Sequence, residues 1–242
     1  TTTITTMGGR IAARIAAAWL LLALSFTATT LQGCEADTSD DPPGGNVLQG
    51  AAFLVETIPY EADLELIHGG RHTWEVLTSF VDQAQSRIHF SAVYWNLLED
   101  SNITADTRGR WGTDKGELLL SSLRNAAKRG VHLFAICGIG ISGVDELKAI
   151  QDEFPDKVSY QIYDAHAWYG GGIMHMKAWI FDDTRALVTS SNTDWKSLTQ
   201  VKEMGVAVEG PPGFQFVKDL QLYFDRWWTW TDPALRKSLA KP

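Results

Sequence analysis

The residues best suited to do chemistry lie between positions 175 and 192 of this chain. His175 and Lys177 are separated by one residue, and Ser190 and Asn192 follow after a short interval. The residues beside the histidine and the lysine are apolar, which is typical of a buried β-strand. Alternate side chains of a strand share a face, so we expect His175 and Lys177 to point the same way.

Two basic side chains on one face of a buried strand are unfavourable unless an anion lies between them. A phosphate is the natural candidate, because a histidine can attack phosphorus or transfer a proton. Lys177 and Asn192 can hold the phosphoryl oxygens while negative charge is redistributed, and Ser190 can donate another hydrogen bond. We expect no metal and no other cofactor, since these side chains supply the cationic groups themselves.

The spacing of these residues resembles the signature of the phospholipase D superfamily, which reads H-x-K, four residues, D, six residues, G-S-x-N. Every gap of the signature is matched by His175, Lys177, Asp182, Ser190 and Asn192. Thr189 is a departure, because the family usually has glycine at that place. The family also has an acidic residue shortly after the asparagine, and Glu203 matches it.

The resemblance extends over about residues 53–230 and implies roles for the matched residues. Glu203 is read in the family as the carboxylate that orients a catalytic histidine. Asp182 follows the motif strand, where an aspartate more often fixes a neighbour than does chemistry. The run from Asn192 to Glu203 is similar to one branch in particular, the lysosomal phospholipase D-like 5′ exonucleases of single-stranded nucleic acid.

The implied function is metal-independent hydrolysis of a phosphodiester through a phosphohistidine intermediate. The substrate is either a phospholipid or the end of a single-stranded nucleic acid, and the sequence leaves both open. Tyr94, Trp95 and Trp168 are aromatic residues that can stack on bases or contact acyl chains. The other histidines are interpreted as structural; they are His68, His72, His89, His132 and His166.

We find only one such motif in the chain and no internal repeat. In the family, two motifs converge across a pseudo-twofold axis, so that one histidine attacks phosphorus and the other protonates the leaving oxygen. The chain therefore resembles one half of the usual two-domain enzyme, and activity would require a homodimer or a missing second half. The alternative is a catalytically incomplete half-domain, either a fragment or a binding and assembly module.

Composition limits the class of protein further. The chain has 242 residues, which is enough for one domain with a sizeable core, and 11% of them are aromatic, which excludes a disordered protein. The net charge of −8 does not favour a protein that grips long duplex nucleic acid, because such proteins usually show a basic face. A local basic pocket remains compatible with small or end-bound substrates.

Residues 1–34 are interpreted as a targeting segment, because a basic start precedes the apolar run 15–28, which is short for a membrane span. The segment ends at Cys34 in a sequence that resembles the lipobox of bacterial lipoproteins; a conventional secretory signal or a signal anchor are the alternatives. Residues 35–50 are predicted to be a flexible acidic linker. Each alternative predicts an extracytoplasmic domain, secreted or membrane-anchored, which is lipoprotein-like if bacterial and lumenal if eukaryotic.

Residues 51–232 are predicted to form the phospholipase D-like phosphodiesterase domain, with a tail at 233–242. Besides the motif strand, strands are predicted at 51–57, 87–95, 131–137, 158–163, 186–190 and 201–209. Helices are predicted at 73–85, 113–129, 144–154 and 214–230, and an aromatic, glycine-rich loop at 165–172. Strands that alternate with helices indicate an α/β fold with a mixed β-sheet flanked by helices. The resemblance implies the phospholipase D-like α/β/α sandwich.

Overall fold

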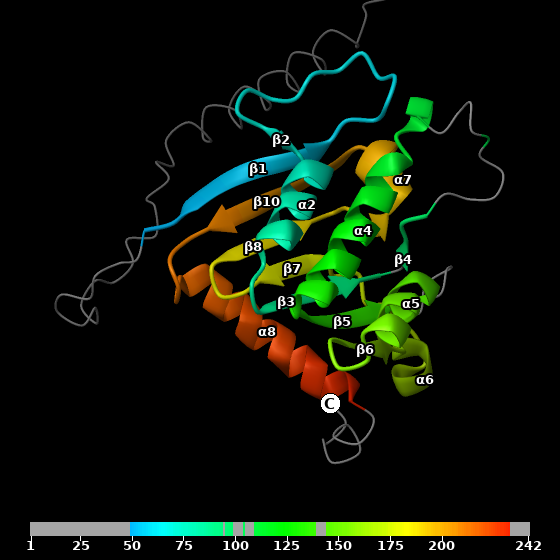
Figure 1. Ribbon diagram of the computed structural model, residues 1–242, viewed down its shortest axis with the longest axis vertical. Helices are drawn as coiled ribbons and strands as arrows, with labels where there is room; N and C mark the ends of the chain where they lie inside the picture. The colour runs from blue at the N-terminus through cyan, green and yellow to red at the C-terminus, as the bar shows by residue number, and fades with distance from the viewer. Residues whose placement is uncertain (1–48, 94, 99–103, 105–108, 139–143, 233–242) are drawn as a thin grey trace, which may run out of the picture. The chain divides into compact units, whose positions relative to one another are not determined.

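The computed structural model describes residues 49–93, 95–98, 104, 109–138 and 144–232 (Figure 1). The predicted targeting segment, nearly all of the predicted linker, and the tail lie outside these ranges, as does Tyr94. None of the described helices is long and apolar enough to cross a membrane.

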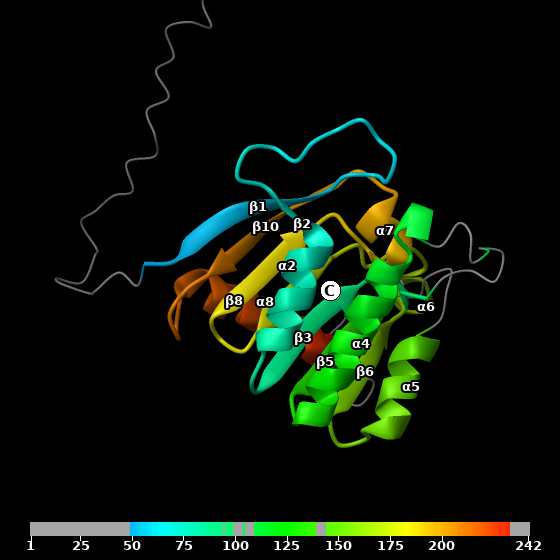
Figure 2. The ribbon, with the colours of Figure 1, turned by 45° about the horizontal axis from the view of Figure 1, so that its top comes forward.

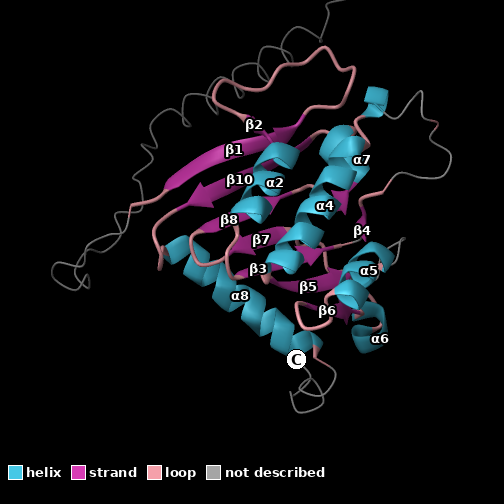
Figure 3. Cartoon of the chain, in the orientation of Figure 1, coloured by secondary structure: helices cyan, strands magenta, loops and turns pink. Residues whose placement is uncertain are grey.

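A mixed β-sheet forms the centre of the described domain (Figure 3). Across the sheet its strands are β2 (Arg71–His72), β1 (Ala51–Thr57), β10 (Glu203–Glu209), β8 (Arg185–Thr189), β7 (Ala178–Phe181), β3 (Arg87–Ala92), β5 (His132–Gly138) and β6 (Val158–Tyr163). The pairs from β1 through β10, β8 and β7 to β3 are antiparallel, whereas β3, β5 and β6 run parallel. A separate small sheet pairs β4 (Trp95–Asn96) with β9 (Thr193–Asp194).

Helices cover both faces of the large sheet, as Figure 2 shows. One face is covered by α2 (Thr73–Gln83), α4 (Asp114–Arg129) and α5 (Asp145–Glu153), and α8 (Gln215–Thr231) crosses the other. Two short helices, α6 (Ala165–Tyr169) and α7 (Trp195–Thr199), complete the domain. The predicted fold, a mixed sheet flanked by helices, is therefore confirmed.

Strand β7, a central strand of the sheet, shows why the motif residues lie at a strand end and not within the strand. Its side chains alternate, so that Trp179 and Phe181 join the core beneath α2 and α4 while Ile180 joins the core beneath α8. Trp179 stacks on Phe90 of the neighbouring strand β3 at 4.3 Å between ring centroids. All four residues of β7 are buried, so polar groups can be accommodated only at its two ends.

Several local predictions differ from the structure. The strand predicted at 87–95 ends at Ala92, and Trp95 belongs to the separate small sheet. The motif strand begins at Ala178, so His175 and Lys177 lie in the extended segment before it. The loop predicted at 165–172 is wrong for residues 165–169, which form α6 because the Asp164 carboxylate accepts a hydrogen bond from Ala167 N at 2.9 Å and caps the helix. The short elements β2, β9 and α7 were not predicted.

Candidate active site

His175 and Lys177 lie just before the start of β7, at the side of the sheet where the parallel strands β3, β5 and β6 have their carboxyl ends. Thr189 N donates a hydrogen bond to the Lys177 carbonyl at 3.1 Å, so the backbone of this segment continues the β7–β8 ladder. The Lys177 side chain is buried, whereas His175 is exposed to solvent. Lys177 Nζ lies 2.9 Å from His175 Nδ1 and 3.2 Å from Nε2, and it donates to the His175 carbonyl at 3.1 Å. The structure therefore brings the two basic side chains together.

Electrostatics make the Lys177 ammonium receptive to an anion. Burial lowers the pKa of Lys177, and the charge of the Glu203 carboxylate partly opposes this change. The described hydrogen bonds of the ammonium all go to His175, a neutral or cationic partner. A phosphate oxygen that bound here would provide the full opposite charge that a partly desolvated ammonium favours.

Ser190 and Glu203 are held together by the pairing of β8 with β10. Ser190 N donates to the Met204 carbonyl at 3.0 Å, and Met204 N donates to Ser190 Oγ at 3.1 Å. Ser190 Oγ in turn donates to the Glu203 carboxylate. Glu203 thus contacts Ser190 and acts on Lys177 through its charge, and its oxygens make no described hydrogen bond to His175.

Asn192 offers the site an unpaired amide. Asn192 is half-buried in the segment between β8 and β9. Its Oδ1 atom is buried and has no hydrogen-bond partner among the described protein groups. An unpaired buried amide oxygen costs about 1–3 kcal/mol, so a native structure that keeps one usually has a use for it. This oxygen is therefore available to accept a hydrogen bond from a donor group of a ligand beside Ser190.

Thr189 replaces the usual glycine of the signature, and its neighbours accommodate it. Its hydroxyl donates to the Met204 carbonyl at 3.3 Å and accepts from Ser191 N at 3.1 Å. Across the strand pair it faces Gly205, where an added Cβ would lie 2.8 Å from Thr189 Cβ. A glycine is thus present at this crowded point, but on the partner strand.

Asp182 is not brought to the other five residues. It begins the turn after β7, at the opposite end of the strand from Lys177, and five residues of extended chain span roughly 16 Å. Its carboxylate accepts hydrogen bonds from Ser86 N and Oγ at 2.8 Å each, from Arg87 N at 3.1 Å and from Gln85 N at 3.0 Å. Partial burial alone would raise the pKa of Asp182, but these hydrogen bonds together lower it.

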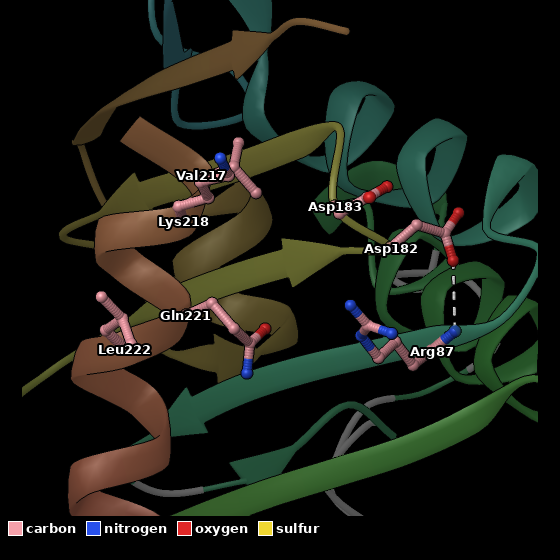
Figure 4. Close-up of a pocket in the computed structure, with 7 residues that line it drawn as sticks. All are labelled: Arg87, Asp182, Asp183, Val217, Lys218, Gln221 and Leu222. Carbon is pink, nitrogen blue, oxygen red and sulfur yellow. Dashed lines mark hydrogen bonds between the residues drawn. The ribbon is translucent and has the colours of Figure 1, made fainter. Parts of the chain in front are cut away.

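Figure 4 shows this far end of β7, where Asp182 lies beside Arg87 at one side of a pocket whose other side is α8. Asp182 also has a positive φ of 54°, so the turn that it begins depends on these side-chain contacts. The geometry assigns Asp182 to holding the β7–β8 hairpin against the segment before β3.

Three other residues singled out in the sequence pack against aromatic side chains. Trp95 is fully buried and its Nε1 donates to Glu146 at 2.6 Å, so this residue belongs to the core and does not offer its ring to a substrate. His89 packs between Phe134 and Phe224, and burial lowers its pKa to about 4. Trp168 packs edge-to-face on Tyr163 at 4.9 Å between centroids.

Two further features bear on the chemistry of the chain. Cys137 is a free, buried thiol, and burial raises its pKa to about 12. Within the described ranges, no group of three or more His, Cys, Asp or Glu side chains is placed to hold a metal ion.

Sequence reasoning missed an aromatic wall beside His175. Tyr163 at the end of β6 and Tyr223 and Trp227 of α8 line a cavity that reaches this histidine. The available signal was the spacing of Tyr223 and Trp227, which are four residues apart and therefore neighbours on one helix face.

Comparison with known families places this geometry in a class. Residues 77–228, more than half of the chain, match the family model described as "Cardiolipin synthase, PLD-like domain". The chain belongs to the phospholipase D superfamily of phosphodiesterase domains, which confirms the resemblance seen in the sequence.

Particular relatives include both nucleases and a phospholipase by name. The chain is similar to 5'-3' exonuclease PLD3 of Xenopus laevis, with 29% identity over 181 residues that cover 72% of this chain and 34% of the relative. It is 25% identical over 177 residues to the virion nicking-joining enzyme of vaccinia virus strain Western Reserve. That match covers 73% of this chain and 38% of the viral enzyme. It is 27% identical over 201 residues to phospholipase D Y of Dictyostelium discoideum. That match covers 77% of this chain and 41% of the relative.

The chain thus spans between about a third and two fifths of the length of these relatives. Among solved structures it is similar to Nuc of Salmonella typhimurium, a phospholipase D family member, with a TM-score of 0.51 and 14% identity. That alignment covers 74% of this chain and 95% of Nuc, and at this identity it shows a shared fold.

Proposed function

We propose that this domain hydrolyses phosphodiesters without a metal ion and that His175 forms a phosphohistidine intermediate. The observation that carries the proposal is the Lys177 ammonium, which is buried and held 2.9 Å from the imidazole of the exposed His175. Such an arrangement places a nucleophile within reach of solvent and a cation where the non-bridging oxygens of a phosphate would lie.

The reaction would proceed in two displacements. An imidazole nitrogen of His175 bonds to phosphorus while the bond from phosphorus to the leaving oxygen breaks, and that oxygen takes a proton from an acid. Water then attacks the phosphohistidine, the N–P bond breaks, and the proton of the water returns to the same acid–base group. Lys177 and the NH2 group of the Asn192 amide donate to the non-bridging oxygens, and the Ser190–Glu203 pair keeps a negative charge beside Lys177.

The acid of this scheme would be a second imidazole, supplied by another copy of the chain. An uncovered strip of the sheet beside the site supports such an assembly. Leu54 of β1, Val206 of β10 and Val188 of β8 are cross-strand neighbours, and each is 40% exposed although apolar. Met204, next to Glu203, extends the strip and is 62% exposed. A twofold-related copy would cover this strip and bring the two His175 side chains together.

The substrate would be a phosphodiester of either a phospholipid or a single-stranded nucleic acid end. The names of the relatives are compatible with both substrates, since they include exonucleases, nicking-joining enzymes and a phospholipase D. We place the domain outside the cytoplasm, attached or secreted through the segment 1–34, because that segment has the composition of an export signal.

Trapping the covalent intermediate tests the proposal. Acid-free quenching during turnover of bis-p-nitrophenyl phosphate, followed by mass spectrometry, should show a phosphoryl-ester adduct on the peptide that contains His175. The His175→Ala protein should fold normally and show neither the adduct nor turnover, and wild-type turnover should survive excess EDTA. Activity of folded His175→Ala protein above about a tenth of wild type, or a requirement for an added divalent metal, would contradict the proposal.

The second candidate is a catalytically incomplete half-domain that binds or assembles without turnover. It is favoured by the presence of only one H-x-K motif in the given sequence and by Thr189 in place of the usual glycine. Substrate binding by wild-type protein without any adduct on His175 would support this alternative.

A further inference from the structure

A cavity of about 250 Å³ adjoins the proposed nucleophile. Its lining includes His175, the flanking Met174 and Met176, and the rings of Tyr163, Tyr223 and Trp227. The Trp227 ring lies edge-to-face with both tyrosines, at 5.6 Å from Tyr163 and 6.2 Å from Tyr223 between centroids. Three separate elements, β6, α8 and the segment before β7, therefore build one aromatic wall.

The inner side of this wall is packed and its outer side is open. Met174 is buried beneath it, and Trp227 packs against the core under α8. Tyr223 is 46% exposed and Ile173, at the rim of the cavity, is 70% exposed. An open aromatic surface that touches a nucleophilic histidine has the form of a ligand subsite, since its rings are held in place before any ligand arrives.

We propose that this cavity binds a nucleobase next to the scissile phosphate of single-stranded nucleic acid. The inference rests on the function proposed above and specifies its substrate class. A base is joined to its phosphate through a single sugar, so a phosphate at His175 places a neighbouring base at the adjoining cavity. Tyrosine and tryptophan present a flat apolar face and a polar tip, which suit a heterocycle with an apolar face and a polar edge. Base–aromatic stacking of this kind is typically worth about 5- to 150-fold in affinity per base.

The charges around the site favour stacking as the source of affinity. The described residues that line the cavity include no lysine or arginine, and the chain carries a net charge of −8. Lys177 is the cation held at the phosphate position. A strand end bound through one phosphate should show a shallow salt dependence, with a slope of log K against log salt of roughly −0.7.

Binding by the full chain carrying His175→Ala tests the inference without turnover. Oligonucleotides labelled at the 3′ end are compared by fluorescence anisotropy, either intact or abasic at one of the first three 5′ positions. An abasic residue at one of these positions should weaken binding about tenfold. Adding Tyr223→Leu should remove most of this difference by weakening the intact strand alone.

Two more variants complete the design. Trp227→Leu should act like Tyr223→Leu, and the half-exposed Tyr223 serves as the main variant because Trp227 also packs on the core. Phe216→Leu is the matched control, since it truncates an exposed aromatic residue of the same helix that does not line the cavity. This control should keep the full preference for the intact strand.

The inference is overturned if intact and abasic strands bind equally at every position, or if the preference survives both Tyr223→Leu and Trp227→Leu. It is also overturned if Tyr223→Leu abolishes binding to phosphatidylcholine vesicles and leaves oligonucleotide binding unchanged, because the cavity would then take an acyl chain. Failure of the proposed catalytic role is seen separately, as turnover by His175→Ala protein.

Discussion

Lys177 is the residue whose ionisation should control the reaction. Its ammonium must be charged to hold a phosphate, and burial lowers its pKa from the ordinary value of a lysine. The charged form is present below that pKa and is lost as the pH rises through it. We therefore expect kcat/KM for bis-p-nitrophenyl phosphate to fall on the alkaline side at a lower pH than a solvent-exposed lysine would give.

Substitutions of Lys177 check this assignment. Lys177→Arg should move the alkaline limb to higher pH, because arginine stays charged, while Lys128→Arg on the exposed end of α4 should leave the profile unchanged. Lys177→Ala should lower kcat/KM by a factor that corresponds to about 3 kcal/mol, as expected for a lost donor to the transition state. An unshifted alkaline limb in Lys177→Arg protein would assign the ionisation to another group.

At the scale of residues, the sequence predicts the proximity of His175 and Lys177 better than it predicts their surroundings. The H-x-K spacing correctly places the side chains of His175 and Lys177 together, because alternation holds in any extended segment. The separation of Asp182 from that pair also follows from extended geometry. The partner of Thr189, Gly205, was not predictable, because the register between two strands is set by tertiary packing and not by local spacing.

The β7–β8 hairpin is the element that fixes the site, and Asp182 anchors it. Asp182→Asn removes a charged acceptor of four hydrogen bonds, so we expect unfolding free energy at neutral pH to fall by about 1–3 kcal/mol in urea titrations. The rate per folded molecule should change little, since Asp182 lies at the opposite end of β7 from Lys177. Asp183→Asn, at an exposed neighbour in the same turn, is the control.

The pH dependence of stability gives this prediction a sign. The folded-state pKa of Asp182 is lowered, so its contribution is complete above the ordinary pKa of an aspartate and is lost as the pH falls through the lowered value. Wild-type protein should therefore lose stability over this acid range more steeply than Asp182→Asn protein. Parallel curves for the two proteins would mean that the Asp182 hydrogen bonds contribute no net stability.

Elements with strong periodicity were predictable and short ones were not. The main helices follow from apolar residues at helical spacing, and α4 ends at Gly130, whose φ of 98° suits glycine. Helix α7 has only five residues, too few for a periodic pattern, and it depends on Asp194, whose Oδ1 accepts from Ser197 N at 3.0 Å. The aromatic wall joins three distant segments, so the spacing of Tyr223 and Trp227 could indicate its α8 side but not the whole wall.

The whole molecule should be active as a symmetric dimer. Light scattering should give twice the mass of one chain, and the apolar strip of Leu54, Val188, Met204 and Val206 should be covered in that state. After subunit exchange with an equal amount of His175→Ala protein, about a quarter of the dimers would be fully wild type if pairing is random. Activity should then fall below the half that dilution alone predicts.

Substituting the strip separates assembly from chemistry. Val206→Lys should give monomers that fold but turn over slowly, because each keeps one imidazole without its partner. A strictly monomeric wild-type protein with full activity would contradict the dimer. Activity that appears only after addition of a separate chain with a second motif would assign the strip to a missing half instead.

The pairing of β1 with β10 has a consequence for how the protein is made. Glu56 on β1 and Lys202 just before β10 form an ion pair across 146 positions of sequence. A ribosome that adds about 5–20 residues per second needs roughly 7–30 seconds to cover that distance. During this interval β1 lacks the strand with which it forms its antiparallel backbone hydrogen bonds, so that side of β1 is an unpaired strand edge. The candidate site acquires Glu203 only with β10, which makes this site one of the last parts of the domain to form.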